Sequence, residues 1–297
     1  MVDGLIKKEA RDTDEVRKLL QLVNDRPNFF ELLGGEDGLK RMIAGTARAR
    51  IEDIVLVTAT PAQSTKVITL ADRMAPVRAM ILPPDRQIAA WSRANRKFGR
   101  YKIPKYAFRA VEALSVPNLT FADMAEGYVG GILCYGFGGK GKVSDMVLSG
   151  KVPWEYIASQ RATWKWSQVN FDDRRSLREF IGKHSERPVG FYWKLIQLGH
   201  AFQSKPVASA RDLIMSTDWG MGPEGIQFFL THPHYAEQMD GTTNPFMDLS
   251  DYEVSFDGVG VFSSAPCVSF NRGGGELELN SGNVSHPLPN YGSGSLR

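Results

Sequence analysis

Apolar residues recur at helical spacing through most of the first two thirds of the chain. In residues 14–23, Val16, Leu19, Leu20 and Val23 fall on one face, as expected for an amphipathic helix. Proline near the segment ends supports other helices, because it suits the first helical turn and the positions just past the last one. The remaining predicted helices are residues 28–33, 39–50, 87–98, 105–114, 121–128, 154–166, 174–183, 191–202 and 209–215.

Strand patterns are fewer, and the end of the chain has the composition of a mobile arm. Short apolar runs predict strands at residues 54–60, 254–262 and 267–270, and the Gly, Ser, Asn and Pro of residues 273–297 predict an extended C-terminal arm. The expected fold class is therefore mainly α, a two-lobed helical core with a few short strands. We expect an N-terminal helical lobe (1–130), a C-terminal helical lobe (131–240) and a strand-containing acidic segment with a flexible arm (241–297).

Composition indicates a globular intracellular protein. The 297 residues are 42% hydrophobic and 23% charged, which is typical of globular domains. The two cysteines, Cys134 and Cys267, are too few for a disulfide framework or a multi-cysteine zinc site. Charges interrupt the N-terminus, and the longest apolar run, residues 128–139, is short and rich in glycine. We therefore expect a cytoplasmic location and no membrane partner.

Charge is segregated along the chain, although the formal net charge is only +3. Residues 73–109 hold ten Lys or Arg and a single acid, Asp85, whereas residues 212–297 hold two basic residues and eleven acids. Such a distribution predicts a positive face that attracts polyanions, with binding that weakens as salt rises. The acidic block is a candidate cover for that face, in the same copy or a neighbouring one.

The basic stretch interleaves cations with aromatic rings, a mixture suited to single-stranded nucleic acid, because cations follow phosphates while rings stack on bases. The predicted phosphate contacts are Arg93, Arg96, Lys97, Arg100, Lys102, Lys105 and Arg109, and the predicted base contacts are Trp91, Tyr101 and Tyr106. The alternative is a pair of amphipathic helices with aromatic residues in the core and cations in solvent. Candidates for an opposite wall of the groove are Lys165, Arg174, Arg175 and Arg178.

Patterns typical of enzymes are incomplete. Residues 136–142 satisfy both G-x-G-x-x-G and G-x-x-x-x-G-K, but Val143 stands where a phosphate loop requires Ser or Thr. Lys140 and Lys142 of this loop remain candidate contacts to a phosphate backbone. His232 and His234 flank Pro233, which does not suit a central strand carrying two metal ligands. We expect no catalytic residue, no metal and no cofactor, and we lean against an enzyme.

Two segments resemble proteins that package RNA. Residues 34–50, GGEDGLKRMIAGTARAR, resemble a helical segment of segmented negative-strand virus nucleoproteins, and residues 100–128 resemble the core helices of flexible filamentous coat proteins. In these families a helical core with a basic groove sequesters RNA, and terminal arms link neighbouring subunits. The acidic C-terminal third has no counterpart in them.

The combined expectation is an RNA-binding nucleoprotein of the nucleocapsid type that oligomerises along its strand, located in the cytoplasm or, for a viral protein, in the virion. Its partners would be nucleic acid, with RNA favoured, and further copies of itself. One alternative is a nucleotide-dependent or nucleic-acid-processing enzyme that uses residues 136–142. A second alternative is a structural shell protein such as a viral capsid protein.

Overall fold

The computed structural model describes residues 69–138, 143–179, 186–214, 218–255 and 260–297. Internal contacts divide the chain into two units, Met1–Ile68 and Thr69–Arg297, and all described residues belong to the second. The elements predicted before residue 69 therefore lie outside the described residues. The domain boundaries predicted at residues 130 and 240 both lie inside the second unit.

The second unit begins with helices, mixes helices and strands in its middle and ends with strands. The helices are α5 (Leu70–Met80), α6 (Pro84–Asn95), η1 (Gly99–Tyr101), α7 (Lys105–Val111), α8 (Phe121–Ala125), α9 (Met146–Ala158), η2 (His200–Phe202), α10 (Val207–Ile214), α11 (Pro223–Thr231) and η3 (Pro233–Gln238). The strands are β1 (Tyr128–Gly136), β2 (Thr163–Lys165), β3 (Leu177–Glu179), β4 (Gly190–Gln197), β5 (Trp219–Gly220), β6 (Phe246–Asp248), β7 (Tyr252–Ser255), β8 (Phe262–Asn271), β9 (Glu276–Asn283), β10 (Tyr291–Ser293) and β11 (Ser295–Leu296).

The strands form two sheets. The first has the order β1-β4-β11-β5 and is antiparallel throughout, with Leu133 opposite Trp193 in the pairing of β1 with β4. The second has the order β10-β6-β8-β7-β3, and β9 joins it by pairing with β8 and with β2. Strands from the end of the chain thus complete both sheets.

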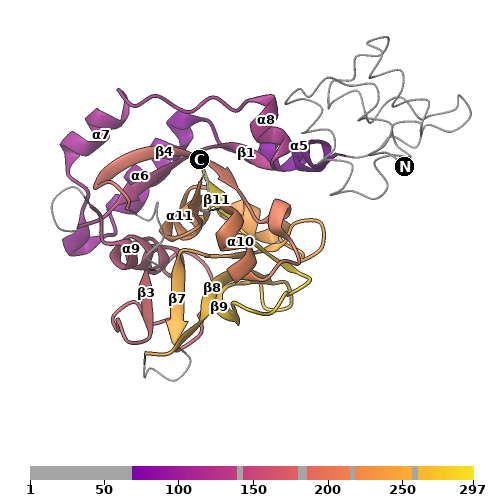
Figure 1. Ribbon diagram of the computed structural model, residues 1–297. Coiled ribbons are helices and arrows are strands. Elements are labelled where there is room, and N and C mark those ends of the chain that lie inside the picture. The colour runs from indigo at the N-terminus through magenta and orange to yellow at the C-terminus, as the bar shows by residue number, and fades with distance from the viewer. Residues whose placement is uncertain (1–68, 139–142, 180–185, 215–217, 256–259) are drawn as a thin grey trace, which may run out of the picture. The chain divides into compact units, whose positions relative to one another are not determined.

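The core lies between these sheets and is centred on α11. All nine residues of α11 are buried, which is typical of a helix enclosed on every side. Figure 1 shows α9 and α11 between strands β1 and β4 and the sheet that contains β7 and β8. Helix α11 packs against α9, α6 and β1, and α9 packs against β3 of the second sheet, so the two helices join the sheets into one core.

The predicted fold class, mainly α with a two-lobed helical core and an extended C-terminal arm, is wrong: the fold is mixed α/β with two multi-stranded sheets. Residues 191–202, predicted as a helix, form most of β4 and then η2. The predicted arm contributes β9, β10 and β11, because Leu277, Leu279 and Leu296 are fully buried. Arg297 anchors the chain end through ion pairs of 2.9 Å with Asp123 and Asp218.

Among the described strands, β1 lies at the edge of its sheet, and α6 supplies hydrogen bonds to its outer side. The side-chain amide of Gln87 accepts from the Leu133 N–H (2.8 Å) and donates to the Gly131 carbonyl (2.9 Å) and to the Leu82 carbonyl (2.7 Å). The Trp91 indole N–H donates to the Leu133 carbonyl at 2.9 Å. Because buried backbone groups need partners, these two side chains fix α6 against β1.

The next part of the same edge is satisfied by α11 and α9. Gln227 accepts from the Tyr135 N–H and donates to the Tyr135 carbonyl, each at 2.9 Å. The Phe137 N–H donates to the Ser149 hydroxyl at 2.9 Å. Side chains from three helices therefore take the place of a neighbouring strand along β1.

A buried ion-pair network holds the N-terminal end of α11. Arg187 has no exposed side-chain surface, and its guanidinium lies 2.9 Å from Glu224 and 2.8 Å from Asp251. It also donates to the Gly220 carbonyl at 2.7 Å, and the Tyr192 hydroxyl donates to Glu224 at 2.7 Å. Since buried charges need complete pairing, this network connects β4, β5, α11 and the turn before β7.

His232 ends α11 and also holds the backbone just before α6. Its Nε2 accepts from the Leu82 N–H at 2.9 Å, which places the ring proton on Nδ1, 2.8 Å from the Thr231 hydroxyl. The ring stacks on Phe228 with 4.6 Å between centroids. Burial lowers the pKa of His232 from 6.5 to about 4, so the neutral ring is a structural part of this contact.

We predict that Gln87→Leu lowers the free energy of unfolding by about 2 kcal/mol, because the buried Leu133 N–H loses its partner and the part-buried bonds to the Gly131 and Leu82 carbonyls are lost, at roughly 0.5–1 kcal/mol each. Urea denaturation measures the change. The matched control is Gln238→Leu, because the Gln238 side chain is exposed. Equal stability of Gln87→Leu and the wild type would show that this amide does not hold the β1 edge.

We predict that stability falls as the pH drops from about 6.5 to 4, in part through His232. The unfolded chain binds a proton at the ordinary pKa of 6.5 whereas the folded chain resists it until about 4, so protonation favours unfolding in that window. At about 1.4 kcal/mol per pKa unit the loss is on the order of 3 kcal/mol. His232→Gln should flatten the pH profile of the unfolding free energy, and the exposed control His286→Gln should leave it unchanged.

Candidate functional site

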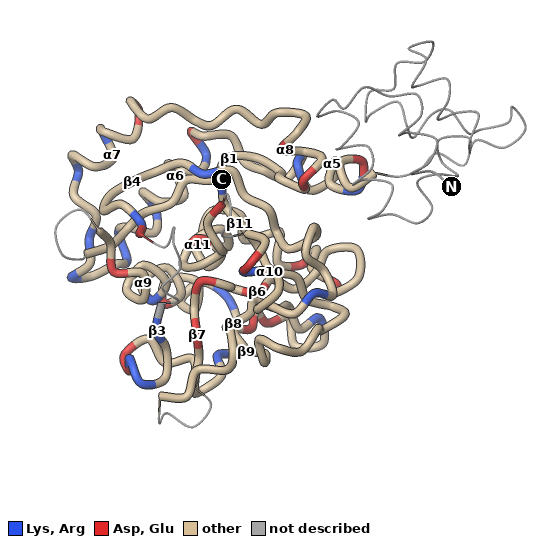
Figure 2. Tube along the Cα trace, in the orientation of Figure 1, with Lys and Arg blue, Asp and Glu red and all other residues tan. Residues whose placement is uncertain are grey.

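The predicted phosphate contacts form one exposed basic segment, which we call the α6–α7 surface. It comprises Arg93, Arg96, Lys97, Arg100, Lys102, Lys105 and Arg109, all of them exposed. No carboxylate among the described residues forms an ion pair with any of the seven. Figure 2 shows several Lys and Arg positions beside α7, along this segment. The segment therefore carries positive charge that the described part of the protein does not neutralise.

The aromatic residues of this stretch divide between the core and the surface. Trp91 is fully buried, and its ring lies 6.2 Å from that of Phe98 in an edge-to-face contact. The ring of Phe108 packs against the ring of Phe191, with 5.1 Å between the ring centroids. Tyr106 is 73% exposed, and half-buried Tyr101 accepts a hydrogen bond of 2.7 Å from Arg100. Tyr106 and Tyr101 are thus the rings that a bound base can reach, whereas Trp91 is not accessible.

The cations predicted for an opposite wall have partners within the protein. Arg174 pairs with Asp145 at 3.0 Å, Arg175 with Asp173 at 3.2 Å and Arg178 with Glu253 at 2.9 Å. Lys165 is half-buried and donates to the Val169 carbonyl at 2.7 Å. Carboxylates therefore neutralise the three arginines and a backbone carbonyl occupies Lys165, whereas the seven cations of the α6–α7 surface have no carboxylate partner among the described residues.

The glycine-rich loop begins at a packing constraint. A Cβ atom on Gly136 would collide with the carbonyl oxygen of Pro188, so close approach of two backbones explains the first glycine. Lys140 and Lys142, the predicted phosphate contacts of this loop, lie outside the described residues.

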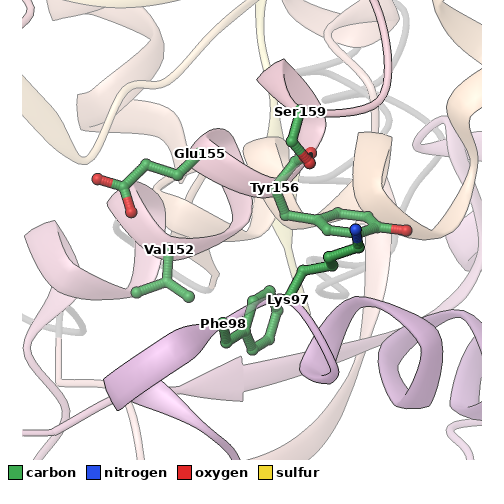
Figure 3. A pocket seen from close by; sticks show the side chains of 6 residues that line it. All are labelled: Lys97, Phe98, Val152, Glu155, Tyr156 and Ser159. Atoms are coloured by element: carbon green, nitrogen blue, oxygen red, sulfur yellow. Dashed lines mark hydrogen bonds between the residues drawn. The ribbon is translucent and has the colours of Figure 1, made fainter.

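The C-terminal end of α6 borders a small pocket against α9. The pocket has a volume of about 180 Å³ and is lined by Lys97, Phe98, Glu155 and Tyr156, among others. Figure 3 shows the Lys97 ammonium beside Tyr156 and the Glu155 carboxylate at the opposite end. Sequence reasoning missed Tyr156, because no local signal shows that a residue in α9 borders the basic helix.

Clusters of ionisable residues elsewhere are enclosed in the core. Arg187, Glu224 and Asp251 are almost fully buried, and burial raises the pKa of the Cys134 thiol well above its usual value. His232 is occupied by two hydrogen bonds, whereas His234 is exposed. Among the described residues, no group of three His, Cys, Asp or Glu side chains is arranged to hold a metal. None of these clusters provides an accessible reactive group.

Within the part of the chain that the structure describes, no helix has the length and apolarity required to cross a bilayer. No known protein family, curated protein or solved structure matches the chain.

Proposed function

We propose that this protein binds single-stranded nucleic acid, RNA in particular, through the α6–α7 surface. The observation that carries the proposal is the set of seven exposed cations without a carboxylate partner among the described residues. Other exposed arginines are paired, for example Arg174 with Asp145 and Arg178 with Glu253, whereas Arg73 and Arg272 are single exposed cations without a carboxylate partner among the described residues. A surface that leaves one basic segment unpaired is suited to an external anion.

Backbone phosphates are the appropriate anion for this arrangement. Cations that neutralise phosphates release condensed counterions, so affinity grows with each contact and falls as salt rises. Arg93, Arg96 and Arg100 add planar guanidinium groups, which hold phosphate with two hydrogen bonds. Basic residues that follow one another along a segment match a polyanion better than a single small ligand.

Exposed aromatic rings favour a single strand over a duplex. Tyr106 lies between Lys105 and Arg109 in the sequence and exposes 73% of its surface. Unpaired bases stack on such rings at roughly 1–3 kcal/mol per base, with little dependence on sequence. Bases inside a duplex are already stacked and do not reach them.

The proposal extends to packaging of a long strand. A surface with seven phosphate-binding side chains occupies several nucleotides, so copies that bind one strand lie side by side along it. Cooperative binding along the strand is the usual behaviour of such proteins. Measurement of the nucleotides bound per protein at saturation, on strands of increasing length, tests this part.

The test is a salt series with two matched triple variants. In the first, Arg96, Lys102 and Lys105 are each replaced by Gln, and in the second Arg174, Arg175 and Arg178 are each replaced by Gln. Fluorescence anisotropy of a labelled single strand gives Kd at each salt concentration. We expect weaker salt dependence in the first variant. The negative slope of log K against log salt should become less steep by about 2, since each phosphate contact contributes roughly 0.7 to its magnitude. We expect the second, which removes the same formal charge, to keep the wild-type slope.

Two results would contradict the proposal. One is a wild-type slope near zero, because binding that does not depend on salt does not use phosphate contacts. The other is an equal loss of affinity in both variants, because a general change in net charge would then explain it. Melting temperatures of both variants establish that each is folded.

A further inference from the structure

A second pocket lies beside the basic helix, between α6, α9 and α11. It has a volume of about 240 Å³, which is smaller than the roughly 300–1,000 Å³ of sites for drug-sized ligands. Its polar wall consists of Arg93, Tyr156, Gln160 and Arg161, and its apolar wall includes Phe229 and Leu230. Tyr156 also borders the pocket at Lys97, so the two pockets adjoin along the side of α6.

Arg161 is held in place but keeps unused hydrogen-bonding capacity. Its Nη1 donates to the Pro233 carbonyl at 3.0 Å, and its guanidinium lies 5.2 Å from the centre of the Phe270 ring. Its Nη2 forms an ion pair of 3.8 Å with Glu237, a separation too long for a hydrogen bond, and its buried Nε has no acceptor among the described residues. A partly enclosed guanidinium with free donors is a favourable place for an anion.

The charge of this pocket is positive. Arg93 and Arg161 both line it, and no carboxylate does so among the described residues. The adjoining pocket differs, because Glu155 faces it together with Lys97. An anion is therefore expected to prefer the pocket of the two arginines.

We propose that this pocket binds a phosphomonoester through Arg93 and Arg161 and thereby recognises the phosphorylated end of a bound strand, an inference that rests on the proposed function. A phosphomonoester carries about −1.5 to −2 charges at neutral pH, whereas a diester within the strand carries one. Two positively charged arginines, Arg93 and Arg161, match the charge of a phosphomonoester better than that of a diester. The apolar wall formed by Phe229 and Leu230 provides a surface for the adjacent sugar or base.

The experiment compares one labelled strand in three forms, with a 5′-phosphate, with a 3′-phosphate and with hydroxyl groups at both ends. We expect one phosphorylated form to bind about tenfold more tightly than the hydroxyl form, the gain of one charge-assisted contact. Arg93→Gln should abolish this difference. The matched control is Arg109→Gln, an exposed cation that does not line the pocket, and it should weaken all three strands equally.

Equal binding of the three strands to the wild type would overturn the inference, while salt-dependent binding of all three would leave the proposed function intact. The inference also falls if Arg93→Gln and Arg109→Gln weaken the three strands in the same way. If no strand binds, the proposed function fails. Calorimetry with adenosine monophosphate and with adenosine then tests whether the pocket binds a phosphomonoester. Saturable binding of the monophosphate alone, lost in Arg93→Gln, supports a phosphomonoester site, and absence of that binding overturns it.

Discussion

Among the described residues, no strand covers the outer edge of β1, which includes the buried backbone groups of Leu133 and Tyr135. An uncovered edge is costly when buried and prone to aggregation when exposed. Here Gln87 and Trp91 of α6, Gln227 of α11 and Ser149 of α9 supply the missing hydrogen bonds. These bonds fix the rotation of α6 about its axis. Its buried face meets β1, so Arg93 and the cations that follow it face solvent, and α6, α9 and α11 are close enough to enclose a pocket.

The fold departs from the sequence prediction where side-chain periodicity was ambiguous. Helices were predicted over residues 87–98 and 105–114, the second with Pro104 at its start, and the structure has α6 (Pro84–Asn95) and α7 (Lys105–Val111) there. Residues 191–197 contain aromatic and branched residues that suit a buried strand equally well, and pairing with β1 and β11 decides the outcome. In β9 the alternation of Leu277 and Leu279 is a strand signal, but the surrounding Gly, Ser and Asn suggested an arm. In both segments, β4 and β9, pairing with strands distant in sequence determines that the segment forms a strand.

The site was partly visible in the sequence. Cations between residues 93 and 109 follow the polar positions of two amphipathic helices, so their exposure could be predicted. Trp91 was predicted to stack on a base, but it shares the buried helical face of Gln87 and Ala94 and lies in the core. The partner of Arg178, Glu253, is 75 residues away, and the pocket combines α6 with residues near 160 and 230. Local patterns do not contain such contacts.

Photocrosslinking is the most direct measurement of where a strand lies on the protein. A single strand containing 5-iodouridine is irradiated with the full-length protein, and crosslinked peptides are identified by mass spectrometry. The account predicts crosslinks at Tyr106 and Tyr101, within the peptides that cover residues 93–109. Crosslinks confined to the strands of the second sheet, with none in those peptides, would contradict it.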